Sequence, residues 1–344
     1  MRYGMKIADM RCRPPFKAFM NEGHPFCLFD KESTLRKGNF QSGCPDLSRT
    51  IDSRSMDDFI QEMDTAGVDL AVAPYRAAWG DPCNHRAPTD NGELVELMEK
   101  YPGRILGVPG ISPVYHTPDE IEAQINKYVV NGPCRGVAVE PAIDKPNWML
   151  NDKRAMFIYD ICAQHGIPVL ITFRSMSLEQ LAALEEISGI YRNKVNFVLC
   201  HGGGPRTLEV IDLAFWNGNI YISPDGTMPN SPAGMLLAKA ANYMLRDRIL
   251  FGSAFPRCTM QFAVDYWLSC GIREEVLPDI MYGNAAMLDG LIDRMEAELG
   301  EPATLVATGG MSRFITPLCT HKIIYDADLL LRGLLILYRQ NMTE

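Results

Sequence analysis

The chain of 344 residues is long enough for one large α/β barrel with a small appendage, or for two domains of medium size. Apolar residues make up 47% of it and charged residues 22%, proportions that are typical of a folded globular protein and argue against extensive disorder. The formal net charge of −9 at neutral pH, without a basic stripe, argues against a nucleic-acid partner.

Short apolar runs rich in Val, Ile and Leu alternate with helical patterns along most of the chain. Eight of these runs are predicted to be buried parallel strands, in the order Met5–Ala8, Asp69–Ala73, Ile105–Gly110, Gly136–Glu140, Pro168–Thr172, Val195–Cys200, Asn219–Ser223 and Arg248–Phe251. Helical patterns lie between them, at Ser55–Ala66, Asn91–Lys100, Pro118–Val130, Lys153–His165, Ser177–Ile187 and Arg206–Trp216. Eight strands in this α/β alternation predict a closed (β/α)8 TIM barrel rather than an open sheet.

The residues just after each predicted strand are the candidate site, because barrel active sites are built from the loops at the carboxyl ends of the strands. The side chains at these places are Arg11, Arg13, Arg76, Glu140, Arg174, His201, Asp225 and Ala254. The segment from Arg13 to Ser53 is a long insertion after the first strand, and we expect it to form a flap over the mouth of the barrel.

The ten cysteines are scattered along the chain without a Cys-x-x-Cys pair. A disulfide scaffold is the alternative, but we expect free thiols, because a chain of this length with strong core signals does not need covalent cross-links. The N-terminal stretch lacks the apolar run of a secretory signal, and no apolar run approaches the roughly 18 residues that a membrane span requires. We therefore expect a cytoplasmic protein without a membrane partner.

Six motifs along the barrel region carry a family resemblance. They read IADMRCRPP at residues 7–15, RGV at 135–137, GIPVLI at 166–171, CHGGG at 200–204, ILFGSAFP at 249–256 and YGNAA at 282–286. Taken in this order, from about Lys6 to Leu288, they resemble the amidohydrolase-related family of the amidohydrolase 2 type, which includes metal-dependent decarboxylases and hydrolases. The resemblance implies a TIM barrel of the metal-dependent hydrolase superfamily over residues 1–288, and a hydrolase or carbon–carbon lyase activity.

The positions at which this family binds metal are mostly substituted here. Where the resemblance implies the two histidines of an Asp-x-His-x-His pattern, this sequence has Arg11 and Arg13. The strand-five histidine position holds Thr172, and the strand-eight aspartate position holds Ala254. Only His201 keeps a ligand side chain, since a protonated guanidinium has no lone pair to donate to zinc. We therefore predict that the barrel binds no metal at the usual place and that no cofactor is required.

The arginines at the strand ends indicate what takes the place of the metal. Guanidinium groups in one pocket of low dielectric constant repel one another unless an anion or carboxylate offsets their charge. Glu140 and Asp225 could supply part of the offset, and a substrate carboxylate or phosphate could supply the rest through bidentate contacts. We therefore expect a small anionic substrate, bound by Arg11, Arg13, Arg76 and Arg174.

His201 is the candidate general acid and base, because its ordinary pKa lies near neutrality and it follows a buried strand. The alternative is a hydrogen-bonded histidine that serves barrel packing. Glu140 and Asp225 are the other catalytic candidates, although Glu140 could equally be only the salt-bridge acceptor of an arginine. Arg11 and Arg13 could likewise be a structural clamp on the loop that follows them.

The last part of the chain carries a different pattern, with RMEAELGEP at residues 294–302, VATGG at 306–310, DAD at 326–328 and LRGL at 331–334. These stretches resemble the C-terminal end of type III pantothenate kinases, which implies a fragment of an actin-like ATPase fold. That fold also needs an Asp-x-Gly-Asn phosphate loop and a catalytic aspartate, which do not occur in these residues. Kinase activity is therefore not expected, because a fragment cannot position ATP, magnesium and acceptor together.

Residues 289–344 are predicted to form a small α/β appendage. We expect a helix at Asp289–Leu299, a short strand near Thr304–Ala307 and an apolar helix from Ala327 to Tyr338. The last helix is too apolar to face water on all sides, so it has to pack on the barrel, on itself or on another subunit. A homo-oligomer contact through this helix is the simplest of these arrangements.

Three functions remain open at this stage. The first is an amidohydrolase-like hydrolase or lyase that acts on a small anionic substrate without the usual metal centre, with His201 as acid and base and the arginines as a clamp. The second is a non-catalytic barrel that binds a ligand or serves as a scaffold. The third is pantothenate kinase activity, which only the C-terminal segment favours. TIM barrels catalyse many different reactions, so the choice among these three functions depends on the residues of the site and not on the fold.

Overall fold

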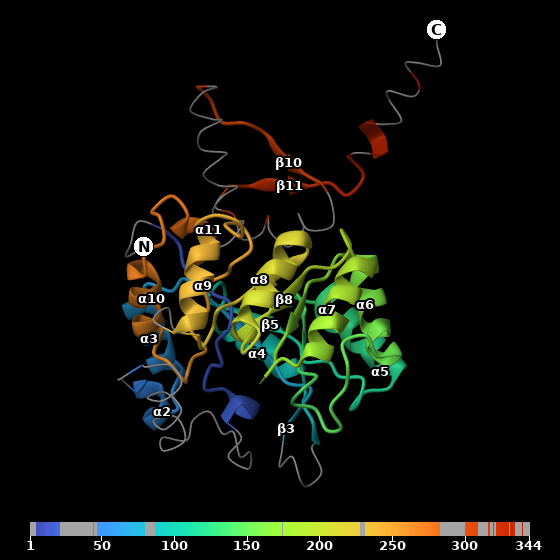
Figure 1. Ribbon diagram of the computed structural model, residues 1–344, viewed down its shortest axis with the longest axis horizontal. Coiled ribbons are helices and arrows are strands. Elements are labelled where there is room, and N and C mark those ends of the chain that lie inside the picture. Colours follow the sequence, from blue (N-terminus) through green and yellow to red (C-terminus); the bar gives the residue numbers. More distant parts are fainter. Residues whose placement is uncertain are drawn as a thin grey trace. The chain divides into compact units, whose positions relative to one another are not determined.

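The computed structural model describes residues 5–20, 44, 47–79, 87–173, 175–227, 231–282, 300–308, 316, 319, 321–329, 331–333 and 339. The chain divides into two compact units, residues 1–283 and 284–344 (Figure 1). The domain boundary that we predict between residues 288 and 289 lies outside the described residues. Most of the predicted flap, residues 21–43, lies outside them as well.

Seven described strands of the first unit are parallel and, together with residues 249–255, close into a ring. One run consists of β1 (Ala8–Asp9), β2 (Leu70–Pro74) and β5 (Ile105–Val108). The other consists of β6 (Val137–Val139), β7 (Val169–Ile171), β8 (Phe197–Leu199) and β9 (Ile220–Ile222). Single parallel bridges join the runs, at Gly110 with Ala138, Ile222 with Ile249 and Cys12 with Phe255. Residues 249–255 therefore take the place of the eighth strand, and the predicted TIM barrel is confirmed.

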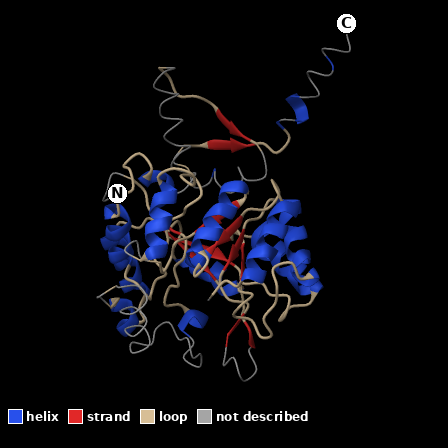
Figure 2. Cartoon of the chain, viewed as in Figure 1, coloured by secondary structure: helices blue, strands red, loops and turns tan. Residues whose placement is uncertain are grey.

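The apolar strands form the core because parallel strands are buried on both faces. Neighbouring strands contribute one residue each to a single hydrophobic cluster, made of Val72, Val108, Ala138, Leu170 and Val198. Met10, the residue after β1, and Leu250, in the segment 249–255, pack against this cluster. Figure 2 shows the strands in the centre of the unit with the helices around them.

The helices surround the barrel in the order expected from the sequence. They are α2 (Arg49–Ser53), α3 (Met56–Ala66), α4 (Gly92–Lys100), α5 (Pro118–Ile125), α6 (Lys153–His165), α7 (Leu178–Ile190), α8 (Thr207–Trp216), α9 (Pro232–Ala241), α10 (Met260–Ser269) and α11 (Leu277–Tyr282). A π-helical turn, η3 (Asn126–Val130), extends α5, and short 3-10 helices lie at η1 (Lys17–Met20) and η4 (Cys200–Gly203). Ser and Thr side chains cap several of these helices, and Thr117 forms a capping box with Glu120 at the start of α5.

The smaller elements include an antiparallel pair, β3 (Ala78–Trp79) with β4 (Ala87–Pro88), in the first unit. The second unit holds a parallel pair, β10 (Leu305–Ala307) with β11 (Ile323–Tyr325), so the strand predicted near Thr304–Ala307 is present. The helix predicted at Asp289–Leu299 lies outside the described residues, and the C-terminal helix is described only in part, where residues 329 and 331–333 are helical.

None of the described helices is long and apolar enough to cross a membrane. The eight cysteines that the structure describes are free, which agrees with the expectation of unpaired thiols for that part of the chain. Six of them are buried. Cys27 and Cys83 lie outside the described residues.

Candidate active site

Six of the seven predicted site residues follow strands of the barrel at their carboxyl ends. Arg11 and Arg13 come directly after β1, and Arg76 follows β2. Glu140 is the residue after β6, His201 lies in η4 directly after β8, and Asp225 follows β9. The strands are parallel, so these loops meet at one end of the barrel. Arg174 lies outside the described residues.

Asp225 and His201 form a close pair. Oδ2 of Asp225 lies 2.9 Å from Nδ1 of His201, and Oδ1 accepts the backbone N–H of His201 at 2.8 Å. Burial opposes ionisation of Asp225, but the charges of His201 and Arg11 outweigh it and hold the pKa of this carboxyl well below its usual range. Burial lowers the pKa of His201 below its ordinary value, against the raising effect of Asp225. This shift favours the neutral form of the imidazole.

The backbone at His201 is unusual for a residue with a side chain. Its φ is 62°, in the left-handed region, and Gly202 and Gly203 follow with φ of 61° and 71°. A Cβ at Gly203 would meet Cγ2 of Val210 at 2.6 Å, so the turn between β8 and α8 needs glycine there. Strained conformations of non-glycine residues gather at functional sites, and here the turn places the ring of His201 against Asp225.

Glu140 lies between two arginines. Its Oε1 is 2.7 Å from Nη2 of Arg13, and its Oε2 is 2.8 Å from Nε of Arg76. Burial opposes ionisation of Glu140, but Arg76, Arg13 and Arg11 together lower its pKa to about 2. A carboxylate that is so strongly ionised, with both oxygens paired, is a poor proton carrier. The geometry is that of the salt-bridge acceptor, the alternative that the sequence left open.

Three guanidinium groups in this cluster share two carboxylates. Arg11, Arg13 and Arg76 are at most 5% exposed, and Nε of Arg11 lies 3.3 Å from Oδ2 of Asp225. The carboxylate of Asp225 also contacts His201, so Arg11 is not its only partner. Burial, followed by the charges of Arg76 and Arg11, lowers the pKa of Arg13 well below its usual range. We call Arg11, Arg13, Arg76, Glu140 and Asp225 the arginine cluster.

A buried donor on Arg13 lacks a hydrogen bond within the described part of the chain. Nε of Arg13 is buried and forms no hydrogen bond with any residue that the structure describes. A buried donor left in this state costs about 1–3 kcal/mol. A small molecule with an acceptor oxygen would satisfy this donor and would also balance the positive charge around it.

Asp9 is a residue of the site region that the sequence analysis did not single out. Its Oδ1 accepts the backbone N–H of Ser253 at 2.9 Å and that of Arg11 at 3.1 Å. Its Oδ2 accepts from the hydroxyl of Ser253 and from Sγ of Cys12. Burial raises the pKa of Asp9 above its ordinary value. Asp9 thus joins β1 to residues 249–255 and holds the backbone that carries Arg11. Its position in the sequence, two residues before Arg11, is the feature from which this role could have been predicted.

The residues present do not fit the divalent metal that the family resemblance implies. Arg11 and Arg13 are engaged in ion pairs, and Thr172 and Ala254 stand at the other two positions. Among the described residues no group of three or more His, Cys, Asp and Glu side chains could hold a metal ion. The pairing of a histidine with a carboxylate is typical of a metal ligand, but three arginines around it would repel a cation.

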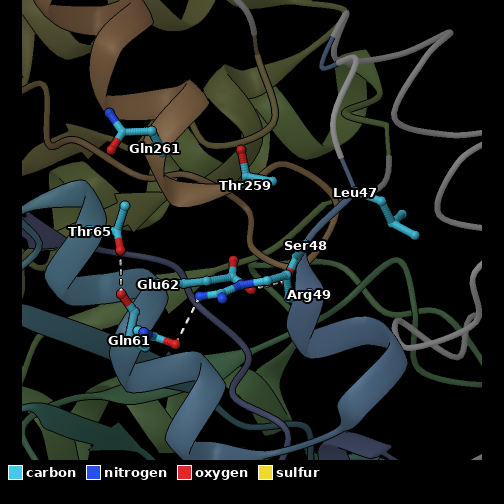
Figure 3. A pocket seen from close by; sticks show the side chains of 8 residues that line it. All are labelled: Leu47, Ser48, Arg49, Gln61, Glu62, Thr65, Thr259 and Gln261. Carbon is cyan, nitrogen blue, oxygen red and sulfur yellow. Dashed lines mark hydrogen bonds between the residues drawn. The ribbon is translucent and has the colours of Figure 1, made fainter.

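A surface pocket of about 460 Å³ lies between α2, α3 and the start of α10 (Figure 3). Its lining is Leu47, Ser48, Arg49, Gln61, Glu62, Thr65, Thr259 and Gln261, and none of these belongs to the arginine cluster. The polar groups of the lining are already partnered, since Nη2 of Arg49 donates to Gln61 at 3.0 Å and the hydroxyl of Ser48 donates to Glu62 at 2.7 Å. This pocket is therefore not the predicted site.

The sequence profile of the family described as amidohydrolase matches residues 49–289. A solved structure of an uncharacterised TIM-barrel protein from Bordetella bronchiseptica is similar to this one, with 25% identity and a TM-score of 0.71 over 86% of this chain and all of that protein. A dihydroxybenzoic acid decarboxylase from a Polaromonas species, solved with bound manganese and the inhibitor 2-nitroresorcinol, has 15% identity and a TM-score of 0.57. It covers 83% of this chain and 96% of its own, and shows a shared fold.

A second similarity concerns a different class of protein. The type III pantothenate kinase of Rhizorhabdus wittichii is 28% identical over 148 residues, which are 42% of this chain and 54% of the kinase. The chain thus spans about half the length of the curated relatives that it matches. The similarity predicted from the sequence is present, and it covers only part of the chain.

Proposed function

The chain belongs to the amidohydrolase family, and we propose that it is a hydrolase or carbon–carbon lyase that acts on a small anionic substrate through the arginine cluster. The observation that carries this proposal is the arrangement of three buried guanidinium groups around two carboxylates, with Nε of Arg13 left unpartnered among the described residues. A carboxylate or phosphate group on the substrate would complete this arrangement, because guanidinium groups bind such oxygens in pairs.

The catalytic group in this proposal is His201. The backbone oxygen of Asp225 accepts the hydrogen bond of Nδ1, and the carboxylate lies 2.9 Å from the same nitrogen, so Nε2 carries the lone pair. Nε2 can therefore take a proton from water or substrate and return it to a leaving group. Asp225 acts as a positioning residue, which keeps the ring in this tautomer. In this proposal Glu140 holds Arg13 and Arg76 in place and does not transfer protons.

We propose that the arginines take over the electrostatic work that a metal does elsewhere in the family. A bound carboxylate or a negative charge that develops in the transition state would be stabilised by preorganised guanidinium groups in a buried site. In this proposal Arg11, Arg13 and Arg76 bind the substrate, and His201 transfers the proton. The position of Arg174 in the sequence, after the fifth predicted strand, makes it a further candidate for substrate binding.

The structural neighbour that acts on a dihydroxybenzoic acid indicates which compounds to test first. We would screen dihydroxybenzoates, aliphatic dicarboxylates and phosphorylated small molecules for a rise in melting temperature, because a ligand that binds only the folded state stabilises it. Compounds that bind would then be followed for product, including release of carbon dioxide. The proposal expects at least one small anion to bind and to be converted.

The variant that tests the catalytic role is His201→Ala, with His165→Ala at the end of α6 as the matched control. We expect His201→Ala to retain ligand binding and the folded state while turnover falls by about 100-fold or more, and His165→Ala to be unchanged. Binding without conversion in the unaltered protein would favour the non-catalytic alternative. A melting temperature that rises with ATP and magnesium would favour kinase activity, which the partial similarity alone does not support.

A further inference from the structure

The outer faces of α8 and α9 carry large apolar side chains in water. On α8 these are Leu208, Phe215 and Trp216, which are 59%, 43% and 70% exposed. On α9 and directly after it they are Met235, Leu236, Tyr243 and Met244, which are 37% to 76% exposed. The two helices pack against each other and lie side by side in Figure 1. We call these seven side chains the α8–α9 face.

We propose that the α8–α9 face is the contact surface of a homodimer, in which α8 of one copy lies on α9 of the other. The proposal does not depend on the function of the arginine cluster. It also differs from the oligomer contact that we predict through the C-terminal helix, which lies largely outside the described residues.

The size of the face matches what a stable dimer needs. Large apolar and aromatic side chains present about 150–250 Å² each when fully exposed. These seven are 37% to 76% exposed, so together they offer on the order of 700 Å² to a partner. The largest apolar patch on a typical monomer is about 300–600 Å², whereas a standard interface buries about 800 Å² on each partner. The α8–α9 face therefore exceeds the first range and approaches the second value.

The charges within the face indicate which partner it fits. Asp212 lies between Leu208 and Phe215 on the exposed side of α8. Lys239 lies between Met235 and Tyr243 along α9, again exposed. Glu209 also lies on this side of α8, where it pairs with Arg206 at 3.2 Å. Asp212 and Lys239 have no ion pair within the described ranges. Each helix thus carries one charge without an ion-pair partner between apolar groups, and these two charges have opposite sign.

A two-fold axis between the helices makes these charges complementary. In such a pairing each copy presents the same surface, so a contact between residue i and residue j occurs twice. If α8 lies on α9 of the second copy, Asp212 faces Lys239 of the second copy, and the apolar groups on either side meet apolar groups. Arg273, whose guanidinium lies 5.4 Å from the ring centre of Tyr243, is paired with Glu275 and leaves Lys239 as the unpaired positive charge that the structure describes on the α9 side. A second copy of this chain therefore satisfies both the apolar area and the charges.

The test is the mass of the full-length protein, measured by sedimentation velocity over a range of concentrations. We expect a dimer. Asp212→Lys would place two lysines opposite each other at both symmetry-related contacts, and we expect the dissociation constant to rise by about 100-fold or more. The double variant Asp212→Lys with Lys239→Asp exchanges the two charges and is expected to restore the dimer. Glu122→Lys, an exposed site on α5, is the matched control and should leave the mass unchanged.

Trp216→Arg provides a second variant, because it disrupts the apolar part of the face at a residue that is 70% exposed. Circular dichroism would verify that each variant is folded. A monomer at all concentrations would overturn the proposal, and so would a dimer that tolerates both Asp212→Lys and Trp216→Arg. A dimer that Asp212→Lys weakens but the charge exchange does not restore would also contradict the pairing of α8 with α9.

Discussion

Nδ1 of His201 lies 2.9 Å from the carboxylate of Asp225 and 3.1 Å from the backbone oxygen of the same residue. Both oxygens are acceptors, so this nitrogen holds the proton of the neutral ring, and Nε2 keeps its lone pair. Asp225 also accepts the backbone N–H of His201. One aspartate therefore sets the position, the tautomer and part of the charge environment of the histidine.

The first prediction concerns Asp225→Asn. The amide keeps the shape of the side chain but removes the negative charge that raises the pKa of His201. We expect turnover to fall by about 100- to 10,000-fold, and the acid limb of the kcat/KM profile to move to lower pH. The measurement is a pH profile of both proteins on a substrate found in the ligand screen. An acid limb that stays in place or moves upward would show that Asp225 does not act through His201.

The second prediction concerns Glu140→Gln. This change leaves Arg13 and Arg76 buried without their carboxylate, and removing one partner of a buried ion pair costs about 3–5 kcal/mol of unfolding free energy. Urea unfolding at pH 7 measures this loss. Glu96→Gln, which breaks the exposed pairs with Lys17 and Lys100, is the matched control and should change the stability little.

The same pair of proteins gives a pH test of the low pKa of Glu140. The carboxyl titrates near its ordinary 4.5 when unfolded and at about 2 when folded, so its ionised form stabilises the protein above pH 4.5. This stabilisation is lost as the pH falls from 4.5 toward 2. We expect the difference between the unaltered protein and Glu140→Gln to shrink across that window. A difference that stays constant would show that Glu140 is not held ionised by the arginines.

The third prediction concerns metal. We expect full-length protein, purified without a tag and dialysed without chelator, to contain far less than one equivalent of zinc, manganese or iron by elemental mass spectrometry. Treatment with a chelator should leave both the melting temperature and the turnover unchanged, because no described residue set offers three ligands. About one metal ion per chain, lost together with activity on chelation, would refute the arginine model and direct attention to His201 and the loop cysteines.

Local patterns in the sequence were sufficient for most of the barrel. The run Val169–Ile171 lies inside the predicted strand because fully buried parallel strands are apolar without interruption. The helix Lys153–His165 agrees with its prediction at both ends, since Asp152 caps its first turn and Gly166 adopts the left-handed conformation that ends it. Helix α7 runs to Ile190, three residues past the prediction, because no breaker follows Ile187 strongly enough to stop it.

The site was predictable only in part. The sequence places Arg11, Arg13 and His201 after strands, and such positions meet at one end of any barrel. It does not show that Glu140 pairs with Arg13, which is 127 residues away, or that Ser253 binds Asp9 across 244 residues. Nothing in local spacing distinguishes a proton carrier from a salt-bridge acceptor at Glu140, because that depends on which charges surround it.

The sequence alone thus determined the elements, their order and the kinds of side chain at the barrel mouth, because periodicity and caps act over a few residues. Only the tertiary structure decided how those side chains pair. Closing the ring brings β1 beside residues 249–255 and sets two arginines on Glu140 and one on Asp225. Burial then makes each charge depend on its neighbours, so the pKa values of His201 and Glu140 are properties of the assembled barrel.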